Sequence, residues 1–128
     1  MTTTTAPARP LLRPALRLDA VVSGLNGLAY LTAAGPLAGL LGLPAGALRG
    51  VGAFLTVFAG AVWTVGARPA PTAVRAVITA NVAWAVGSLA VVLAGLGSPT
   101  TIGAAWLLLQ AGVVAAFAAA QAIGLRRS

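Results

Sequence analysis

The chain has 128 residues, of which 59% are hydrophobic and only 7% are charged. A soluble domain carries about a quarter charged residues to cover its surface, so this composition excludes an ordinary water-soluble fold and indicates a membrane protein. The net charge of +7 comes from arginines that lie between apolar runs and do not form one basic face, which argues against a nucleic acid partner.

The residue types that are missing narrow the chemistry. The sequence contains no cysteine and no histidine, which excludes disulfides, thiol chemistry and the ligation of zinc, haem or iron–sulfur clusters by these side chains. No cofactor is predicted. Asp19 is the only acidic residue and lysine is also absent, so no second group is present for a general acid–base pair. We therefore predict that the protein is not an enzyme.

The N-terminal part of the chain predicts a tail followed by a spanning helix. Residues 1–13 include Pro7, Pro10 and four threonines, and we expect them to form a disordered cytoplasmic tail. The first spanning helix is expected over residues 14–34, because a span needs about 20 mainly apolar residues. Pro14 suits the first turn of that helix, where its missing N–H costs nothing. A cleaved signal peptide would look similar, but polar residues inside the apolar run disfavour it.

The next segment predicts a connection and a second span. Residues 35–46 are too short to cross a bilayer, and they contain Pro36 and Pro44 together with several glycines. We interpret them as a connection with a short interfacial helix near residues 37–41. The second spanning helix is expected over residues 44–67, and a proline-rich loop follows it.

The second half of the chain is apolar enough to require two spans. Residues 76–125 contain no charged side chain, and as one helix they would be about 75 Å long, more than twice the thickness of a bilayer. The chain must therefore fold back, and the breakers lie in residues 95–101. The third and fourth spans are expected over residues 72–94 and 101–125, with residues 126–128 as a short cytoplasmic end.

The arginines predict the orientation of the chain. With four spans, seven of the eight basic residues fall on one side of the membrane and Arg49 falls on the other. Cytoplasmic segments of membrane proteins carry an excess of basic residues, so both termini are predicted to be cytoplasmic and the protein to lie in the cytoplasmic membrane. The fold class predicted for residues 14–125 is all-α: a transmembrane four-helix bundle with a short interfacial segment between its first two spans. The seven residues on the cytoplasmic side are Arg9, Arg13, Arg17, Arg68, Arg75, Arg126 and Arg127.

Polar side chains recur at helical spacing along three of the predicted spans. Because lipid cannot satisfy their hydrogen bonds, we expect them to face the interior of the bundle. The predicted cluster comprises Asp19, Ser23, Asn26, Tyr30, Arg75, Asn81, Trp84, Ser88, Trp106 and Gln110. The same face of the fourth span continues to Phe117 and Gln121. Two interpretations are open: hydrogen bonds that hold the helices together, or a shared pocket for a ligand or partner.

Asp19 lies one to two turns inside the predicted cytoplasmic end of the first span. An unpaired carboxylate in lipid is costly, so we expect an ion pair. Arg17 is two positions away and does not share its helix face, which makes Arg75 the better partner. Asp19 would then be a structural anchor, and the alternative is a proton-coupled carboxylate.

Three short stretches resemble a family of small membrane proteins from high-GC Gram-positive bacteria. They are Leu-Arg-Leu-Asp-Ala-Val-Val-Ser-Gly-Leu-Asn-Gly-Leu-Ala-Tyr over residues 16–30, Leu-Gly-Leu-Pro over residues 41–44, and Leu-Arg-Gly over residues 48–50. The resemblance covers most of the chain after the tail. It implies four helices and no established activity.

Two roles follow from these observations. The first is a structural or accessory helix bundle whose partners are the lipid bilayer and either a second copy or another membrane protein. The alternative is a small oligomeric transporter or a membrane protein that binds an apolar ligand. Small multidrug exporters are similar in length and helix number and use an acid in their first helix, but Asp19 is expected closer to the cytoplasmic edge.

Overall fold

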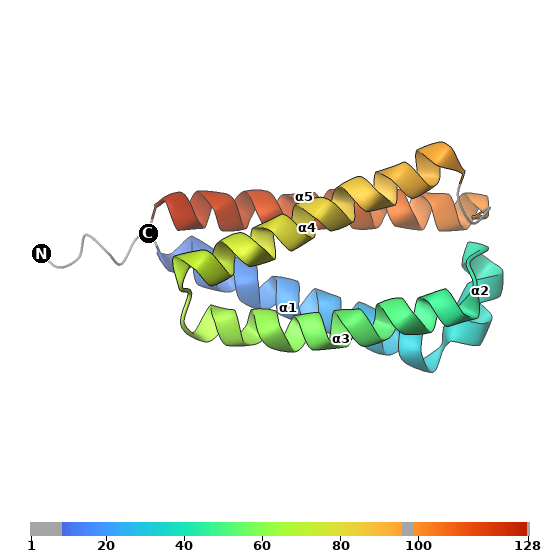
Figure 1. Cartoon of the computed structure of the whole chain (residues 1–128), viewed down its shortest axis with the longest axis horizontal. Helices are drawn as coiled ribbons and strands as arrows, with labels where there is room; N and C mark the ends of the chain where they lie inside the picture. The colour runs from blue at the N-terminus through green and yellow to red at the C-terminus, as the bar shows by residue number, and fades with distance from the viewer. Residues whose placement is uncertain (1–8, 96–98, 128) are drawn as a thin grey trace, which may run out of the picture.

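The computed structural model describes residues 9–95 and 99–127, and the regular structure in this part of the chain is entirely helical, as the composition predicts. Four long helices run along the molecule, and a short helix lies at one end of it (Figure 1). They are α1 (Arg9–Thr32), α2 (Ala34–Leu41), α3 (Ala45–Ala67), α4 (Pro71–Ala94) and α5 (Thr101–Arg126). The start of α1, the α3–α4 loop and the end of α5 share one end, here named the terminal end, and α2 marks the opposite α2 end (Figure 1).

Three of the helices, α3, α4 and α5, are long and apolar enough to cross a bilayer, and α1 joined with α2 would provide a fourth span. The axes of α1 and α2 differ by 98°. The uncharged part of α1 runs from residue 20 to Thr32, about 20 Å at 1.5 Å per residue. This is shorter than a hydrocarbon core of about 30 Å, and because α2 turns away by 98° the pair is a broken span or a re-entrant loop.

The short helix α2 occupies the segment in which an interfacial helix was expected, and it begins three residues earlier, at Ala34. Gly42 ends it with a φ of 71°, a left-handed conformation that glycine adopts without strain. The N–H of Gly42 donates to the carbonyl of Ala38, which satisfies one of the last carbonyls of the helix.

The prediction of a disordered tail over residues 1–13 is wrong for its last part. Helix α1 begins at Arg9, so Pro14 lies inside the helix and not in its first turn. Tertiary contacts explain the extension: Leu12 is only 3% exposed, and Arg13 donates from Nη2 to the carbonyl of Ala67 over 2.9 Å. The burial of Leu12 and the hydrogen bond from Arg13 to α3 therefore outweigh the cost of an internal proline. Residues 1–8 lie outside the described part of the chain.

Glycines let α1 and α3 approach closely. A Cβ atom added to Gly52 would lie 2.8 Å from the carbonyl oxygen of Gly27, and one added to Gly27 would lie 2.7 Å from Oγ1 of Thr56. Such close approach of backbones is the usual way in which helices associate in lipid. Helix α1 also packs against α5, and α4 packs along α5, whereas α3 and α4 barely touch.

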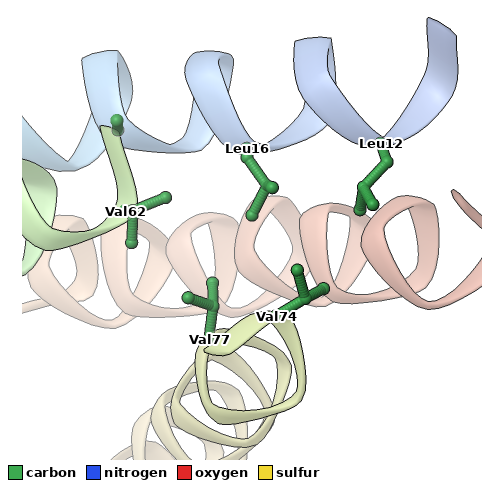
Figure 2. Close-up of a cluster of buried hydrophobic side chains, with 6 residues drawn as sticks. Leu12, Leu16, Val62, Val74 and Val77 are labelled. Carbon is green, nitrogen blue, oxygen red and sulfur yellow. The ribbon is translucent and has the colours of Figure 1, made fainter. Parts of the chain in front are cut away.

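Two hydrophobic clusters lie at the two ends of the bundle. At the terminal end, side chains of α1, α3 and α4 converge beside α5 (Figure 2). That cluster consists of Leu12, Leu16, Ala20, Val62, Val74 and Val77. The cluster towards the α2 end consists of Tyr30, Ala34, Leu41, Leu48 and Leu55. The first holds α3 and α4 together near their loop, whereas Trp84, which is partly buried, is the residue of α4 that packs against the second.

Thr100 links α2 to α5 at the α2 end. Its Oγ1 accepts a hydrogen bond from the N–H of Gly103 over 3.0 Å, which caps the start of α5. The same hydroxyl donates to the carbonyl of Leu40 over 2.7 Å, and the N–H of Thr100 donates to the carbonyl of Leu41 over 3.1 Å. One residue therefore caps α5 and satisfies the last carbonyls of α2.

Candidate functional site

The carboxylate of Asp19 lies at the centre of a hydrogen-bonded network of three helices, here named the Asp19 network. Ser23, one turn further along α1, donates to Oδ1 over 3.0 Å. Asn81 of α4 and Gln121 of α5 each donate to Oδ2 over 2.8 Å. The amino group of Asn81 also donates to Oε1 of Gln121 over 3.0 Å. Asp19, Asn81 and Gln121 therefore form a closed triangle.

The network is buried as well as closed. Asp19 is 1% exposed, Asn81 is 3% exposed and Gln121 is fully buried. Three donors on one carboxylate compensate much of the cost of removing it from water, because hydrogen bonds to a charged group are about twice as strong as neutral ones. With its oxygens engaged in this way, Asp19 holds α1, α4 and α5 together.

The expected pair between Asp19 and Arg75 does not form. Arg75 is exposed, and Asp19 has no basic group within ion-pair distance among the residues that the structure describes. Neutral amides take the place of the arginine, because Asn81 and Gln121 lie deep in the bundle on the face that α1 covers. Arg75 therefore lies outside the polar cluster in which it was predicted.

The arginine nearest to Asp19 in sequence has a different partner. The guanidinium of Arg17 lies over the ring of Trp63, 3.9 Å from its centroid, in the geometry of a cation–π contact. Arg17 also packs on Gly66, where an added Cβ would lie 2.9 Å from Nε. Arg13 donates a hydrogen bond to Ala67, so two arginines of α1 contact the C-terminal end of α3.

A second group of polar side chains lies further along α1 towards the α2 end, and we name it the Tyr30 cluster. Trp106 of α5 donates from Nε1 to the hydroxyl oxygen of Tyr30 over 2.7 Å. Asn26 donates from Nδ2 to Oε1 of Gln110 over 3.4 Å, which is long for a hydrogen bond. This cluster consists of two separate pairs between α1 and α5.

The Tyr30 cluster keeps unused hydrogen-bonding groups. Within residues 9–95 and 99–127, no partner is present for the hydroxyl proton of Tyr30, the amino group of Gln110 or Oδ1 of Asn26. Tyr30 is more than nine-tenths buried, and the other two side chains are partly buried. The only fully buried side-chain nitrogen or oxygen without a partner in the described part of the chain is Nε of Arg17, so these two donors and one acceptor of the Tyr30 cluster are accessible and not sealed in the core.

A cavity of about 30 Å³ lies where these groups meet. Its polar lining joins Asn26, Tyr30 and Gln110 with Ser23 and Asn81 of the Asp19 network. The rest of the lining is apolar or aromatic: Val22, Phe54, Leu55, Phe58, Ala80, Trp84, Val114 and Phe117. This volume holds about two water-sized groups, so it accepts only a small ligand group.

A larger groove of about 580 Å³ opens between α3 and α4. Apolar side chains line it, together with Ser88, and three of its residues also line the cavity: Phe54, Ala80 and Trp84. The rings of Phe54 and Trp84 stack with their centroids 5.9 Å apart and stand between the two spaces. Figure 1 shows why the groove exists: α4 crosses the bundle obliquely and diverges from α3 beyond their loop.

The structure thus divides the ten predicted residues among several places. Asp19, Ser23 and Asn81 share the Asp19 network, whereas Asn26, Tyr30, Trp106 and Gln110 form the Tyr30 cluster. Trp84 and Ser88 line the α3–α4 groove and Arg75 lies outside. The predicted cluster left out Gln121, although its place on the polar face of the last span was a sufficient signal.

Comparison with known proteins finds no relative: no family model, no curated protein and no solved structure matches the chain. The resemblance to small membrane proteins of high-GC Gram-positive bacteria therefore stays a prediction. Any functional conclusion must come from the two polar groups and the spaces beside them. Among the described residues no three acidic, histidine or cysteine side chains come together as a metal site would require.

Proposed function

We propose that this protein is a multi-pass protein of the cytoplasmic membrane, with both termini in the cytoplasm, and that it binds an apolar ligand within the bilayer. The orientation follows from the charges. The terminal end carries the arginines at the start of α1, in the α3–α4 loop and at the end of α5, whereas the α2 end carries Arg49 (Figure 1). Basic residues favour the cytoplasmic side.

One observation carries the binding role. The α3–α4 groove is an apolar space that meets a small cavity with unpaired hydrogen-bonding groups. Ligand sites are commonly apolar clefts of about 300–1,000 Å³ with a few polar groups that orient the ligand. In the proposed orientation the groove opens towards the lipid, so an apolar chain of a ligand restores the dispersion contacts that α3 and α4 do not make with each other.

Asp19 supports binding in preference to proton-coupled transport. A carboxylate that carries protons must exchange them with water or substrate during the cycle. Ser23, Asn81 and Gln121 occupy the oxygens of Asp19, and Asp19 does not line the cavity or the groove. We assign it the role of a structural anchor.

Reporter fusions test the orientation. A reporter that is active only outside the cytoplasm should be silent after Ser128 and active when it is inserted between Gly95 and Thr100. Activity of the C-terminal fusion outside the cytoplasm would overturn the proposed topology.

Thermal melting of the purified protein tests the binding role. Fractionated membrane lipids are added to the protein in detergent, and one apolar fraction should raise the melting temperature in a saturable way. Gly87→Leu should abolish the rise, because Gly87 lines the groove and an added side chain there meets open space. Gly112→Leu is the control, since Gly112 is equally open but lies away from the groove. If no fraction raises the melting temperature, the binding role is wrong.

The accessory role predicted from the sequence is the competing interpretation. It requires that a helix of another protein or of a second copy occupies the groove. Melting curves of the variants distinguish the two roles, because Gly87→Leu should change the response to lipid only if the groove itself holds the lipid.

A further inference from the structure

The unpaired groups of the Tyr30 cluster specify what kind of ligand group fits the cavity. The hydroxyl of Tyr30 and the amino group of Gln110 are donors, whereas Oδ1 of Asn26 is an acceptor. These groups line the cavity, so a ligand group placed there can form hydrogen bonds with them. A ligand that both accepts and donates would satisfy all three, as a hydroxyl or a carboxamide does.

The size of the cavity limits the ligand group further. About 30 Å³ admits a few heavy atoms, which excludes a sugar or a phosphodiester. A hydroxyl or a carboxamide fits. The head of the ligand is therefore small.

The surroundings of the cavity also exclude a charged ligand head. No charged side chain lines the cavity or the groove, and Gln110 lies nine residues into α5, about 14 Å from its start. That depth is near the middle of a hydrocarbon core of about 30 Å, where a charge is costly. An anionic head would also face Asp19 behind Ser23 and Asn81. A cationic head, which only donates, would leave Tyr30 and Gln110 unpaired.

The α3–α4 groove provides the place for an apolar chain. Its lining is almost entirely apolar, and Phe54 at its boundary with the cavity is 51% exposed. The groove is open on the side where α3 and α4 diverge, so a chain can enter laterally from the lipid. The cavity and the groove are neighbours with a common wall of Phe54, Ala80 and Trp84, so a ligand with its head in the cavity and its chain in the groove requires the stacked rings of Phe54 and Trp84 to separate.

We propose that the cavity and the α3–α4 groove together bind a neutral amphiphile with one long apolar chain and a small head that accepts and donates hydrogen bonds. This inference rests on the proposed function and adds the chemical class of the ligand. Tyr30 and Gln110 bind the head, and Trp84 contacts the chain near the head.

A second groove is the main rival site. It has a volume of about 440 Å³ between α1, α2 and α5, and Asn26, Tyr30 and Trp106 line it as well. Gln110 does not line it, and it shares only Asn26 and Tyr30 with the cavity. The α3–α4 groove is larger and adjoins the cavity that all three groups line, so it is the assigned site.

Quenching of tryptophan fluorescence tests the assignment. The protein in lipid nanodiscs is titrated with octadecanamide that carries bromine at mid-chain, and with the matching carboxylate and amine. The amide should quench a fraction of the fluorescence in a saturable way, at a mole fraction about 10-fold lower than the two charged probes. Trp84→Phe should remove most of the saturable quenching, because Trp84 stands between the groove and the cavity.

Substitutions then locate the two parts of the ligand. Tyr30→Phe and Gln110→Leu should each raise the half-saturating mole fraction of the amide about 5-fold, the equivalent of one hydrogen bond. Thr64→Val is the matched control, since Thr64 is exposed and its hydroxyl donates to the carbonyl of Gly60 on its own helix. Gly87→Leu should abolish quenching, whereas Ala105→Leu, which fills the rival groove, should leave it unchanged.

The outcomes separate this inference from the proposed function. Equal or tighter binding of a charged probe would refute the neutral head and leave a ligand-binding protein. Loss of quenching in Ala105→Leu but not in Gly87→Leu would move the site to the rival groove. Absence of saturable quenching by all three probes, with a lipid fraction that still raises the melting temperature, would refute this ligand class alone. If neither assay responds, the binding role is also wrong.

Discussion

The Asp19 network and the Tyr30 cluster both join α1 to α5, but only the first closes on itself. In the Asp19 network a carboxylate accepts three hydrogen bonds and two amides complete a triangle. In the Tyr30 cluster two independent pairs leave donors and an acceptor unused. Under the proposed function the same kinds of side chain have different roles: the closed network stabilises the bundle, and the open one binds the head of the ligand.

The different geometry of α4 explains this contrast. At the terminal end α4 lies beside α3 and its side chains meet those of α1, so Asn81 completes the Asp19 network (Figures 1 and 2). Further along, α4 diverges from α3 and the groove opens. The Tyr30 cluster has no polar partner from α4, although Trp84 lines the same cavity.

The largest effect on stability is expected from Asp19→Ala. The substitution removes an acceptor of three hydrogen bonds and leaves the amides of Asn81 and Gln121 without it. We expect a loss of about 3 kcal/mol in the free energy of unfolding, measured by denaturation in mixed micelles. Ser23→Ala is the comparison, because it removes one neutral donor and should cost about 1 kcal/mol. A loss below about 1 kcal/mol for Asp19→Ala would mean that the closed network is not the stabilising one.

Gly52→Ala should have the next largest effect. The new methyl group would overlap the backbone of Gly27 and force α1 and α3 apart, at a cost of about 2 kcal/mol. Gly60→Ala on the same helix is the matched control, because nothing lies within 4 Å of its added Cβ. It should leave stability unchanged or raise it by up to about 1 kcal/mol. Equal losses in both variants would contradict the close α1–α3 contact.

The sequence predicted the helical elements better than their contacts. Apolar runs and the breakers between them indicate where helices lie, because the thickness of a bilayer limits their length. It did not predict the early start of α1, since Leu12 and Arg13 gain their contacts only after α3 and α5 are in place. From the sequence, Pro14 predicts the start of a helix, because the cost of a proline inside a helix is visible there and the packing that offsets it is not.

The site was predictable as a set of inward-facing residues but not as two groups. Helical spacing places Asp19, Asn26 and Gln110 on inner faces, yet it does not say which side chains meet. Which ones meet depends on the crossing of α4, and the sequence carries no direct signal for that angle. The glycine pairs that stand out at four-residue spacing include Gly46 and Gly50, which have open space around them. The close contact instead uses Gly27 and Gly52 from different helices.

Gln110→Leu should have a much smaller effect on stability than Gln121→Leu. Gln110 makes one long hydrogen bond of 3.4 Å to Asn26, so its loss should cost about 0.5 kcal/mol or less. Gln121 is fully buried and bonded to Asp19 and Asn81, so its replacement should cost about 2 kcal/mol. The same denaturation assay compares the two. A Gln110 variant that unfolds as readily as the Gln121 variant would show that both polar groups are structural.

The smallest effect is expected from Arg75→Gln, and it tests the correction to the sequence-based pairing. Arg75 is exposed and has no contact with Asp19, so its loss should change the free energy of unfolding by less than about 0.5 kcal/mol. The double variant Asp19→Ala, Arg75→Gln should lose the sum of the two single effects, because residues without a shared partner are additive. Asp19→Ala with Gln121→Leu should lose less than the sum, because both substitutions remove the same hydrogen bond. Coupling of Asp19 to Arg75 and additivity with Gln121 would reverse this assignment. The carboxylate would then be anchored by the membrane-surface arginine, and the closed network would no longer distinguish the terminal end from the open half of the bundle.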